Sequence, residues 1–166
     1  MNHIKSVYRI FQFKIRPEMG RPLKLFTLWL WGGFVYYCIE LAWRHESHPS
    51  MFIVGGLCFV LIGGINNYLP WHMGLIWQSL LGASAVTVVE FISGLIINVW
   101  LRLDVWDYSS LPFNILGQVC LAYFFAWIPL SVFGIVLDDY LRWRLFDDEK
   151  PRYSFRSMRI RELPSK

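Results

Sequence analysis

Residues 73–101 read MGLIWQSLLGASAVTVVEFISGLIINVWL, an apolar stretch whose one charged residue is Glu90. An α-helix needs about 20 apolar residues to cross the roughly 30 Å of hydrocarbon in a bilayer. Three more apolar stretches lie at residues 23–43, 51–69 and 112–141, and charged or turn-forming segments separate them. The sequence therefore predicts an all-α integral membrane protein built as a bundle of four transmembrane helices.

The composition of the whole chain supports this prediction. Of its 166 residues, 55% are hydrophobic and 17% are charged, and the mean hydropathy is +0.39. Soluble domains carry about a quarter charged residues, so the composition excludes an ordinary soluble protein and also an intrinsically disordered one. The three cysteines all fall within apolar stretches and indicate no disulfide framework.

The positive charges flank the apolar region. Fourteen of the sixteen Lys and Arg residues lie at or before Lys24 or at or after Arg142, and only Arg44 and Arg102 lie between. By the positive-inside rule, this distribution predicts a multi-pass protein of the cell membrane with both termini in the cytoplasm. A nucleic-acid-binding protein would instead gather its basic residues on one folded face. Membrane lipids are therefore expected partners, and nucleic acid is not.

Three segments follow from this arrangement: residues 1–22, the transmembrane domain at 23–141, and a basic cytoplasmic tail at 142–166. Within the first segment, residues 4–16 place apolar side chains on one helical face and basic side chains on another. This pattern predicts an amphipathic helix on the inner leaflet, with a disordered basic tail as the alternative.

The two halves of the membrane region share an order of features. Glu40 is followed by a tryptophan, a serine, a phenylalanine and then Gly-x-x-Cys, and Glu90 is followed by the same series. The distance from the acid to the Gly-x-x-Cys differs, at 15 residues from Glu40 to Gly55 and 27 from Glu90 to Gly117. Two parallel two-helix repeats, or two unrelated halves, are both compatible with this pattern.

Glu90 needs a partner or a role, because an acid near the centre of a span costs about 2.5–3.5 kcal/mol. It belongs to a small or polar helical stripe that should face the bundle interior, formed by Ala83, Thr87, Glu90, Gly94 and Asn98. Two interpretations stay open. Either Glu40 or Glu90 pairs with Arg44 and the polar groups only hold the bundle together, or Glu40, Glu90 and Asn98 line a cavity for an ion, a proton or a polar head group.

Familiar catalytic motifs are absent from the sequence. It contains no Gly-x-x-x-x-Gly-Lys-Ser/Thr, no Gly-x-Ser-x-Gly and no His-Glu-x-x-His. A metal site in the two outer loops would need three or four converging ligands, and loop histidines are more often merely solvated. The candidate ligands there are His45, Glu46, His48, Asp104 and Asp107. We therefore predict no catalytic residue, no metal site and no cofactor, and an ATP-driven process would need a separate ATPase chain.

Several motifs stand out along residues 30–140. The first group is Gly32, Gly33, Tyr36, Glu40, Trp43 and Arg44, then Ser50, Phe52, Gly55 and Cys58. The second group is Thr87, Glu90, Gly94 and Asn98, then Trp106, Asp107, Tyr108 and Ser109, then Phe113, Asn114 and Gly117. With these motifs the chain resembles the CmpB-like family, labelled ABC-transporter type IV. The acid in the third stretch followed by Trp-Asp-Tyr-Ser is the most specific element of the resemblance.

The resemblance implies a small multi-span membrane protein with a transport-associated role, and it supplies no substrate. The positions that it marks for a binding site are Glu40, Arg44, Glu90, Asn98, Trp106, Asp107, Tyr108 and Asn114, and it implies no catalytic role for any of them. One residue departs from the pattern: His45 stands where we expect a glycine, so the turn there is expected to differ.

Three functions remain open. The first is a permease-like or transport-associated protein with a polar intramembrane cavity, acting as a homodimer or with a separate ATPase or permease subunit. The second is a membrane scaffold or sensor whose buried polar residues are structural. The third is a membrane-embedded enzyme that acts on a lipid-linked substrate, although the sequence lacks a nucleophile and a base at a recognisable spacing.

Overall fold

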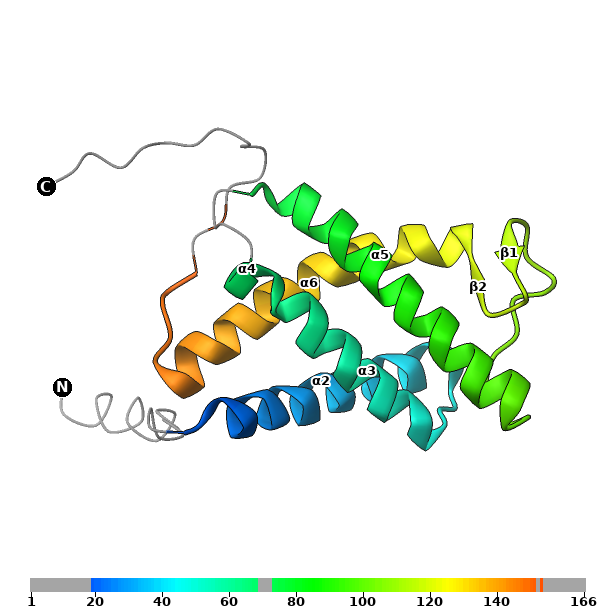
Figure 1. The fold of residues 1–166 in the computed structure, drawn as a ribbon, viewed down its shortest axis with the longest axis horizontal. Coiled ribbons are helices and arrows are strands. Elements are labelled where there is room, and N and C mark those ends of the chain that lie inside the picture. The colour runs from blue at the N-terminus through cyan, green and yellow to red at the C-terminus, as the bar shows by residue number, and fades with distance from the viewer. Residues whose placement is uncertain (1–18, 69–72, 152, 154–166) are drawn as a thin grey trace, which may run out of the picture.

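The structure is a computed structural model that describes residues 19–68, 73–151 and 153. The elements are α2 (Arg21–Arg44), α3 (Pro49–Gly63), α4 (Ile65–Tyr68), α5 (Leu75–Gly94), its π-helical continuation η1 (Leu95–Trp100), the antiparallel strands β1 (Asn114–Ile115) and β2 (Val119–Cys120), and α6 (Leu121–Phe146). The four long helices alternate in direction, so α2 begins and α6 ends at one end of the bundle (Figure 1). We call this the terminal end, and we call the opposite end, which carries residues 101–120, the loop end.

Three helices are long and apolar enough to cross a membrane, namely Arg21–Arg44, Leu75–Trp100 and Leu121–Phe146. The helix α3 is apolar but has 15 residues, which is shorter than a crossing usually requires. The structure thus confirms a mostly helical, membrane-type fold.

The predicted fourth stretch was wrong at both ends. It was expected to be helical from residue 112 to 141, but α6 runs from Leu121 to Phe146. Residues 112–120 form a loop and the β1–β2 hairpin, because Phe113, Leu116 and Gly117 all have positive φ angles, which no right-handed helix accommodates. The expected second stretch, 51–69, is also divided, since α3 ends at Gly63 and α4 follows. The predicted amphipathic helix at 4–16 lies outside the described residues.

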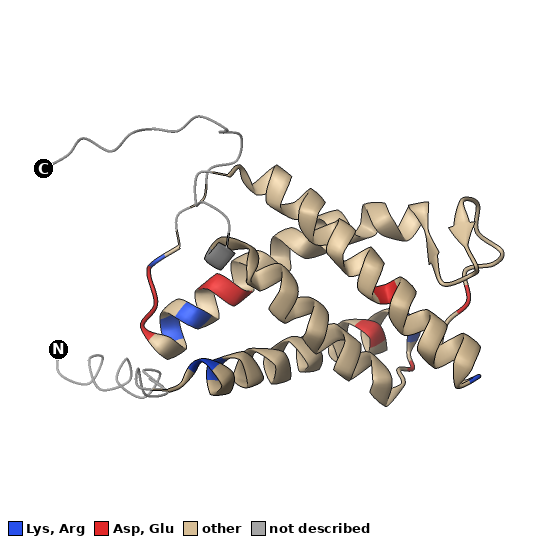
Figure 2. Ribbon diagram, viewed as in Figure 1, with Lys and Arg blue, Asp and Glu red and all other residues tan. Residues whose placement is uncertain are grey.

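The bundle is apolar outside and holds several polar and charged side chains inside, next to three apolar core clusters. Its buried side chains include Glu40, Glu90, Asn98, Asp138 and Arg142, while many large apolar side chains on all four long helices are exposed. A soluble protein would show the reverse, and lipid is the solvent in which this arrangement is favourable. Figure 2 shows that the charged residues gather toward the two ends of the bundle. On α5 the predicted interior stripe is confirmed, with four of its five residues buried and Thr87 partly buried.

Glycines let α2 and α3 pack closely. A Cβ atom added at Gly33 would meet the backbone oxygen of Phe52 on α3, and one added at Gly56 would meet the backbone oxygen of Trp29 on α2. The two helices therefore approach each other through reciprocal glycine contacts. Such contacts matter in a bilayer, where van der Waals packing replaces the hydrophobic effect as the force between helices.

Substituting Gly56→Ala should lower the stability of the purified protein by about 1–3 kcal/mol, because a methyl group there would push against backbone that cannot swing aside. Gly20→Ala is the matched control, since a Cβ at Gly20 meets only Pro22 Cδ at 3.7 Å. Thermal unfolding in detergent measures both variants. Equal unfolding temperatures would show that α2 and α3 do not depend on this close approach.

Candidate functional site

Glu40 lies near the C-terminal end of α2, where it forms an ion pair with Arg44 on the next turn. Arg44 Nη1 lies 2.9 Å from Glu40 Oε1, and the Ser47 hydroxyl donates to Glu40 Oε2 at 2.5 Å. The carboxylate is buried and both of its oxygens are occupied. Of the two possible partners for Arg44, the structure therefore selects Glu40 rather than Glu90.

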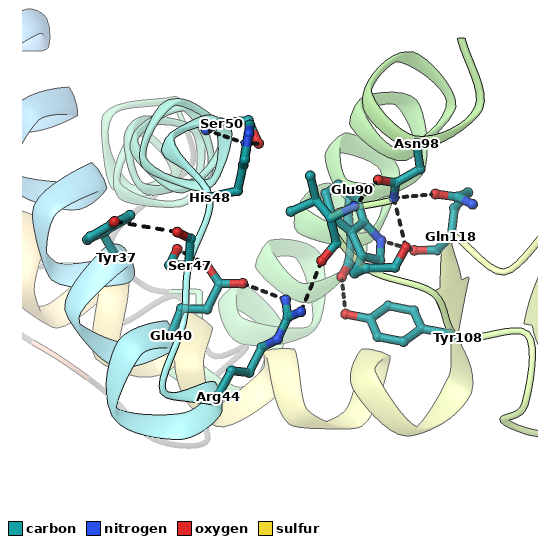
Figure 3. A network of polar contacts seen from close by, with 12 residues as sticks. Tyr37, Glu40, Arg44, Ser47, His48, Ser50, Glu90, Asn98, Tyr108 and Gln118 are labelled. Atoms are coloured by element: carbon teal, nitrogen blue, oxygen red, sulfur yellow. Dashed lines mark hydrogen bonds and ion pairs between the residues drawn. The ribbon is translucent and has the colours of Figure 1, made fainter. Parts of the chain in front are cut away.

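Arg44 also connects α2 to the loop that follows η1. Its Nη2 donates a hydrogen bond of 3.0 Å to the backbone oxygen of Val105, as Figure 3 shows. The helix ends immediately afterwards at His45, whose φ of 62° is the left-handed conformation that glycine favours and whose N–H donates to the Leu41 oxygen. Although His45 replaces the expected glycine, the backbone here adopts the conformation typical of a glycine cap.

Asn98 holds the same loop from the other side. Its amide group donates to the backbone oxygen of Trp106 and to Gln118 Oε1, both at 2.9 Å, and accepts from the Val105 N–H at 2.8 Å. The Trp106 indole donates to the Gln118 backbone oxygen at 3.0 Å. All of these hydrogen bonds are buried, so Asn98 fixes the path of the chain between η1 and β2.

Glu90 is buried in the last turns of α5, before η1, and is held by two neutral donors. The Tyr108 hydroxyl donates to Oε1 at 3.1 Å, and the Trp127 indole N–H donates to Oε2 at 2.8 Å. Among the residues that the structure describes, Glu90 has no ion pair. Burial and the nearby Glu90 carboxylate raise the pKa of the Tyr108 hydroxyl, which keeps it protonated and able to donate.

Asp107 and Asn114 shape the loop itself. Asp107 is exposed and accepts hydrogen bonds from the side chain and the backbone N–H of Ser109, which lower the pKa of its carboxyl group. Asn114 donates to the backbone oxygens of Ser109 and Leu111 and accepts from the Gly117 N–H at 3.1 Å. Asp107 therefore keeps its negative charge at neutral pH, while the hydrogen bonds of Asn114 stabilise the turn that precedes Gly117.

A cavity of about 710 Å³ lies at the loop end, between α2, the loop and α6. Five of the residues marked from the sequence line it: Glu40, Arg44, Trp106, Asp107 and Tyr108. The other three do not. Asn98 and Asn114 stabilise the loop behind the cavity, and Glu90 borders a separate cavity of about 60 Å³ that shares part of its wall, including Trp127. A volume of 710 Å³ is within the range of small-molecule sites.

Comparison with known families gives the affiliation of the chain. The model of the CmpB family, described as "Putative ABC-transporter type IV", matches residues 25–147, which is well over half of the sequence. The chain belongs to this family. The resemblance found in the sequence is thereby confirmed, and the family description supports a transport-associated role without naming a substrate. No curated protein and no solved structure matches the chain significantly.

In this CmpB family member, the structure reveals a second buried polar cluster at the terminal end that the sequence analysis missed. Asp138 pairs with Arg142 one turn later, and Asp139 accepts from Asn66 at 2.6 Å and from Tyr153 at 2.9 Å. We call these five residues the Asp138 cluster. The signal in the sequence was the pair of adjacent acids, with Arg142 four residues after Asp138. These residues fall at the edge of the stretch that was predicted to end at 141.

The described ranges bring no three His, Cys, Asp or Glu side chains together in a way that could hold a metal ion. In the Asp138 cluster, Asp138 Oδ1 and Arg142 Nη2 have no hydrogen-bond partner within the described part of the chain. The loop-end cavity is therefore the stronger candidate for ligand binding, because it offers both volume and polar groups.

Replacing Asn98→Leu should cost about 2–5 kcal/mol, because it leaves the buried Val105 N–H and Trp106 oxygen without partners. Unfolding in detergent gives the stability, and hydrogen exchange at Val105 reports the local loosening of the loop. Ser84→Ala is the control, since the exposed Ser84 hydroxyl bonds only to the Leu80 oxygen of its own helix. A slow-exchanging Val105 amide in the Asn98 variant would refute the role assigned to Asn98.

The Asp138→Leu variant should lose about 3–5 kcal/mol, because it leaves the Arg142 charge buried without its partner. The double variant Asp138→Leu with Arg142→Met should recover much of this loss, since removing both charges also removes the cost of burying them. A double-mutant cycle of unfolding free energies measures the coupling. Additive losses would show that the two side chains do not stabilise each other.

Proposed function

We propose that this protein is a transport-associated membrane subunit whose loop-end cavity receives the transported molecule. The observation that carries the proposal is the 710 Å³ cavity itself, which places the Glu40–Arg44 pair, Asp107 and Tyr108 around one space in a member of an ABC-transporter-related family. A bundle with a pocket at one end, lined mainly by apolar and aromatic side chains with a few polar groups, has the features needed to admit a small molecule from one side of the membrane.

The proposal includes four membrane crossings. The alternating directions of α2, α3, α5 and α6 support it, as does the continuation of the short α3 into α4. Among the described residues, Arg21, Lys24, Arg142 and Arg144 lie at the terminal end, and by the positive-inside rule they support a cytoplasmic position for that end and an outer position for the cavity. The proposal keeps a membrane domain at residues 23–141. It also keeps two cytoplasmic segments, at residues 1–22 and 142–166.

The proposal also includes partners. The sequence has no P-loop, so an ATP-driven process would rely on a separate ATPase subunit, and a homodimer or a second permease subunit would complete the pathway. Two parallel repeats are supported by the packing, because α2 packs most extensively with α3, and α5 with α6. Membrane lipids surround the exposed apolar faces.

A scaffold or sensor is the second candidate. The observation in its favour is that Glu40, Arg44 and Asn98 already have protein partners, so none of them needs a ligand to be satisfied. In that case the cavity would be a by-product of loop packing and filling it would have no effect.

Filling the cavity distinguishes the two candidates. Ala126 lines the cavity on α6, whereas the exposed Ala122 one turn earlier does not. In cells that lack the chromosomal copy, Ala126→Trp should behave like the deletion and Ala122→Trp like the wild type. The readout is the metabolite content of cells and medium by mass spectrometry, with membrane abundance of each variant measured in parallel.

If Ala126→Trp restores the same metabolite levels as the wild-type gene does, this result would contradict transport through the cavity and favour the scaffold. Loss in both variants at normal abundance would also contradict it, because the effect would not be specific to the cavity.

A further inference from the structure

The wall of the large cavity is rich in aromatic rings. Six of its lining residues are aromatic, namely Tyr36, Trp43, Trp106, Tyr108, Tyr123 and Trp127. Tyr108 stacks on Tyr123 with ring centroids 4.4 Å apart, and Tyr36 stacks on Trp127 at 6.0 Å. Aromatic rings attract cations through their electron-rich faces, and they also accommodate apolar groups.

The charges on the lining favour a cation. Three charged side chains line the cavity, and Glu40 and Arg44 neutralise each other as an ion pair. The third is the carboxylate of Asp107, which leaves the lining with a net negative charge. Arg44 is the sole basic residue on the described lining, and its two terminal nitrogens already bond to Glu40 and Val105. The cavity lining therefore offers an anionic ligand few free hydrogen-bond donors, and its net negative charge disfavours the binding of an anion.

The Glu90 carboxyl group lies directly behind the wall. The two donors that hold its carboxylate, the Tyr108 hydroxyl and the Trp127 indole, belong to rings that line the cavity. Figure 3 shows the Tyr108 hydroxyl directed at Glu90. A carboxylate that accepts these hydrogen bonds polarises both rings and makes them more attractive to a cation.

Glu90 has no counter-charge among the described residues. A buried carboxyl group without a basic partner is costly to ionise. A cation in the cavity would lie on the far side of the Tyr108 and Trp127 rings and would favour the ionised form of Glu90. The cavity volume is far larger than a bare inorganic ion requires, so the cation should carry apolar substituents.

We propose that the loop-end cavity binds an organic cation of the substituted-ammonium type, held against Tyr108 and Trp127 with Glu90 as the counter-charge. This inference rests on the proposed function, because it names the ligand class of the same cavity.

The test uses a pair of probes of nearly equal size and opposite charge, tetraphenylphosphonium and tetraphenylborate. The full chain is placed in nanodiscs of zwitterionic lipid, and binding is measured by equilibrium dialysis, with empty nanodiscs subtracted to remove partition into lipid. Tetraphenylphosphonium should bind the wild type at least 10-fold more tightly than tetraphenylborate does. Ala126→Trp should abolish this binding and thereby assign it to the cavity.

Charge variants then test the role of Glu90. Glu90→Gln should weaken tetraphenylphosphonium binding about 10-fold, whereas Glu46→Gln, which changes an exposed acid away from the cavity, should leave it unchanged. Trp127→Phe keeps a ring but loses the N–H donor, so it should weaken binding by a smaller factor. Since the two probes are compared on the wild type, the proposal remains testable even where a variant fails to fold.

The outcomes separate this inference from the proposed function. The wild type could prefer tetraphenylborate, or bind both probes equally, and lose this binding in Ala126→Trp. Either result would overturn the cation inference but would leave the cavity as a binding site. Binding that survives Ala126→Trp, or no binding of either probe, would also overturn it. The proposed function fails separately, if the Ala126→Trp variant restores the metabolite pattern of wild-type cells.

Discussion

The hydrogen bonds of Asn98 hold irregular backbone in place at the end of a membrane helix. Backbone N–H and C=O groups outside a helix must find partners if they are to lie at the edge of a bilayer, because lipid provides none. The Asn98 side chain supplies two of those partners, for the Val105 N–H and the Trp106 oxygen, and it also bonds to the Gln118 side chain across the loop. The loop contributes Trp106, Asp107, Tyr108, Ser110 and Leu111 to the wall of the cavity, so part of the shape of the cavity follows from the position of Asn98 on η1.

Glu40 and Glu90 show how one residue type serves two purposes in the same bundle. Glu40 has a full ionic partner in Arg44 and a further donor in Ser47, which makes it a structural connection between α2 and its surroundings. Glu90 has only the neutral donors Tyr108 and Trp127. The first carboxyl group has a cationic partner and the second has none among the described residues, so the two acids differ in what holds them inside the bundle.

The sequence predicted the helical membrane fold well because hydropathy and length record how side chains partition into lipid. It failed at residues 112–120, where Phe113, Ile115 and Leu116 look like part of a span. Hydropathy does not record backbone conformation, and the positive φ angles of Phe113 and Leu116 exclude a helix. It also stopped at 141, five residues before the end of α6, since the charges of Arg142 and Arg144 resemble a tail.

The candidate site was predicted in part. The polar stripe on α5 and the i,i+4 pair of Glu40 and Arg44 could be found from spacing alone, because both are local on a helix. The bonds from Tyr108 and Trp127 to Glu90 join segments 18 and 37 residues apart, and no periodic pattern reports such contacts. The Asp138 cluster was missed for the same reason, since Asn66 and Asp139 lie 73 residues apart.

The helices α2 and α6 converge at the terminal end and diverge toward the loop end, as the two arms of a V do (Figure 1). At the apex, Lys24 Nζ lies 3.0 Å from Asp148 Oδ1, and Leu28, Leu141 and Phe146 share a buried cluster. The 24 residues of α2 act as a lever about 36 Å long, so a tilt of about 5° at the apex moves the far end by about 3 Å. That displacement is comparable to the width of a water molecule, and the hydrogen bond from Arg44 to the Val105 oxygen at the far end of α2 opposes it.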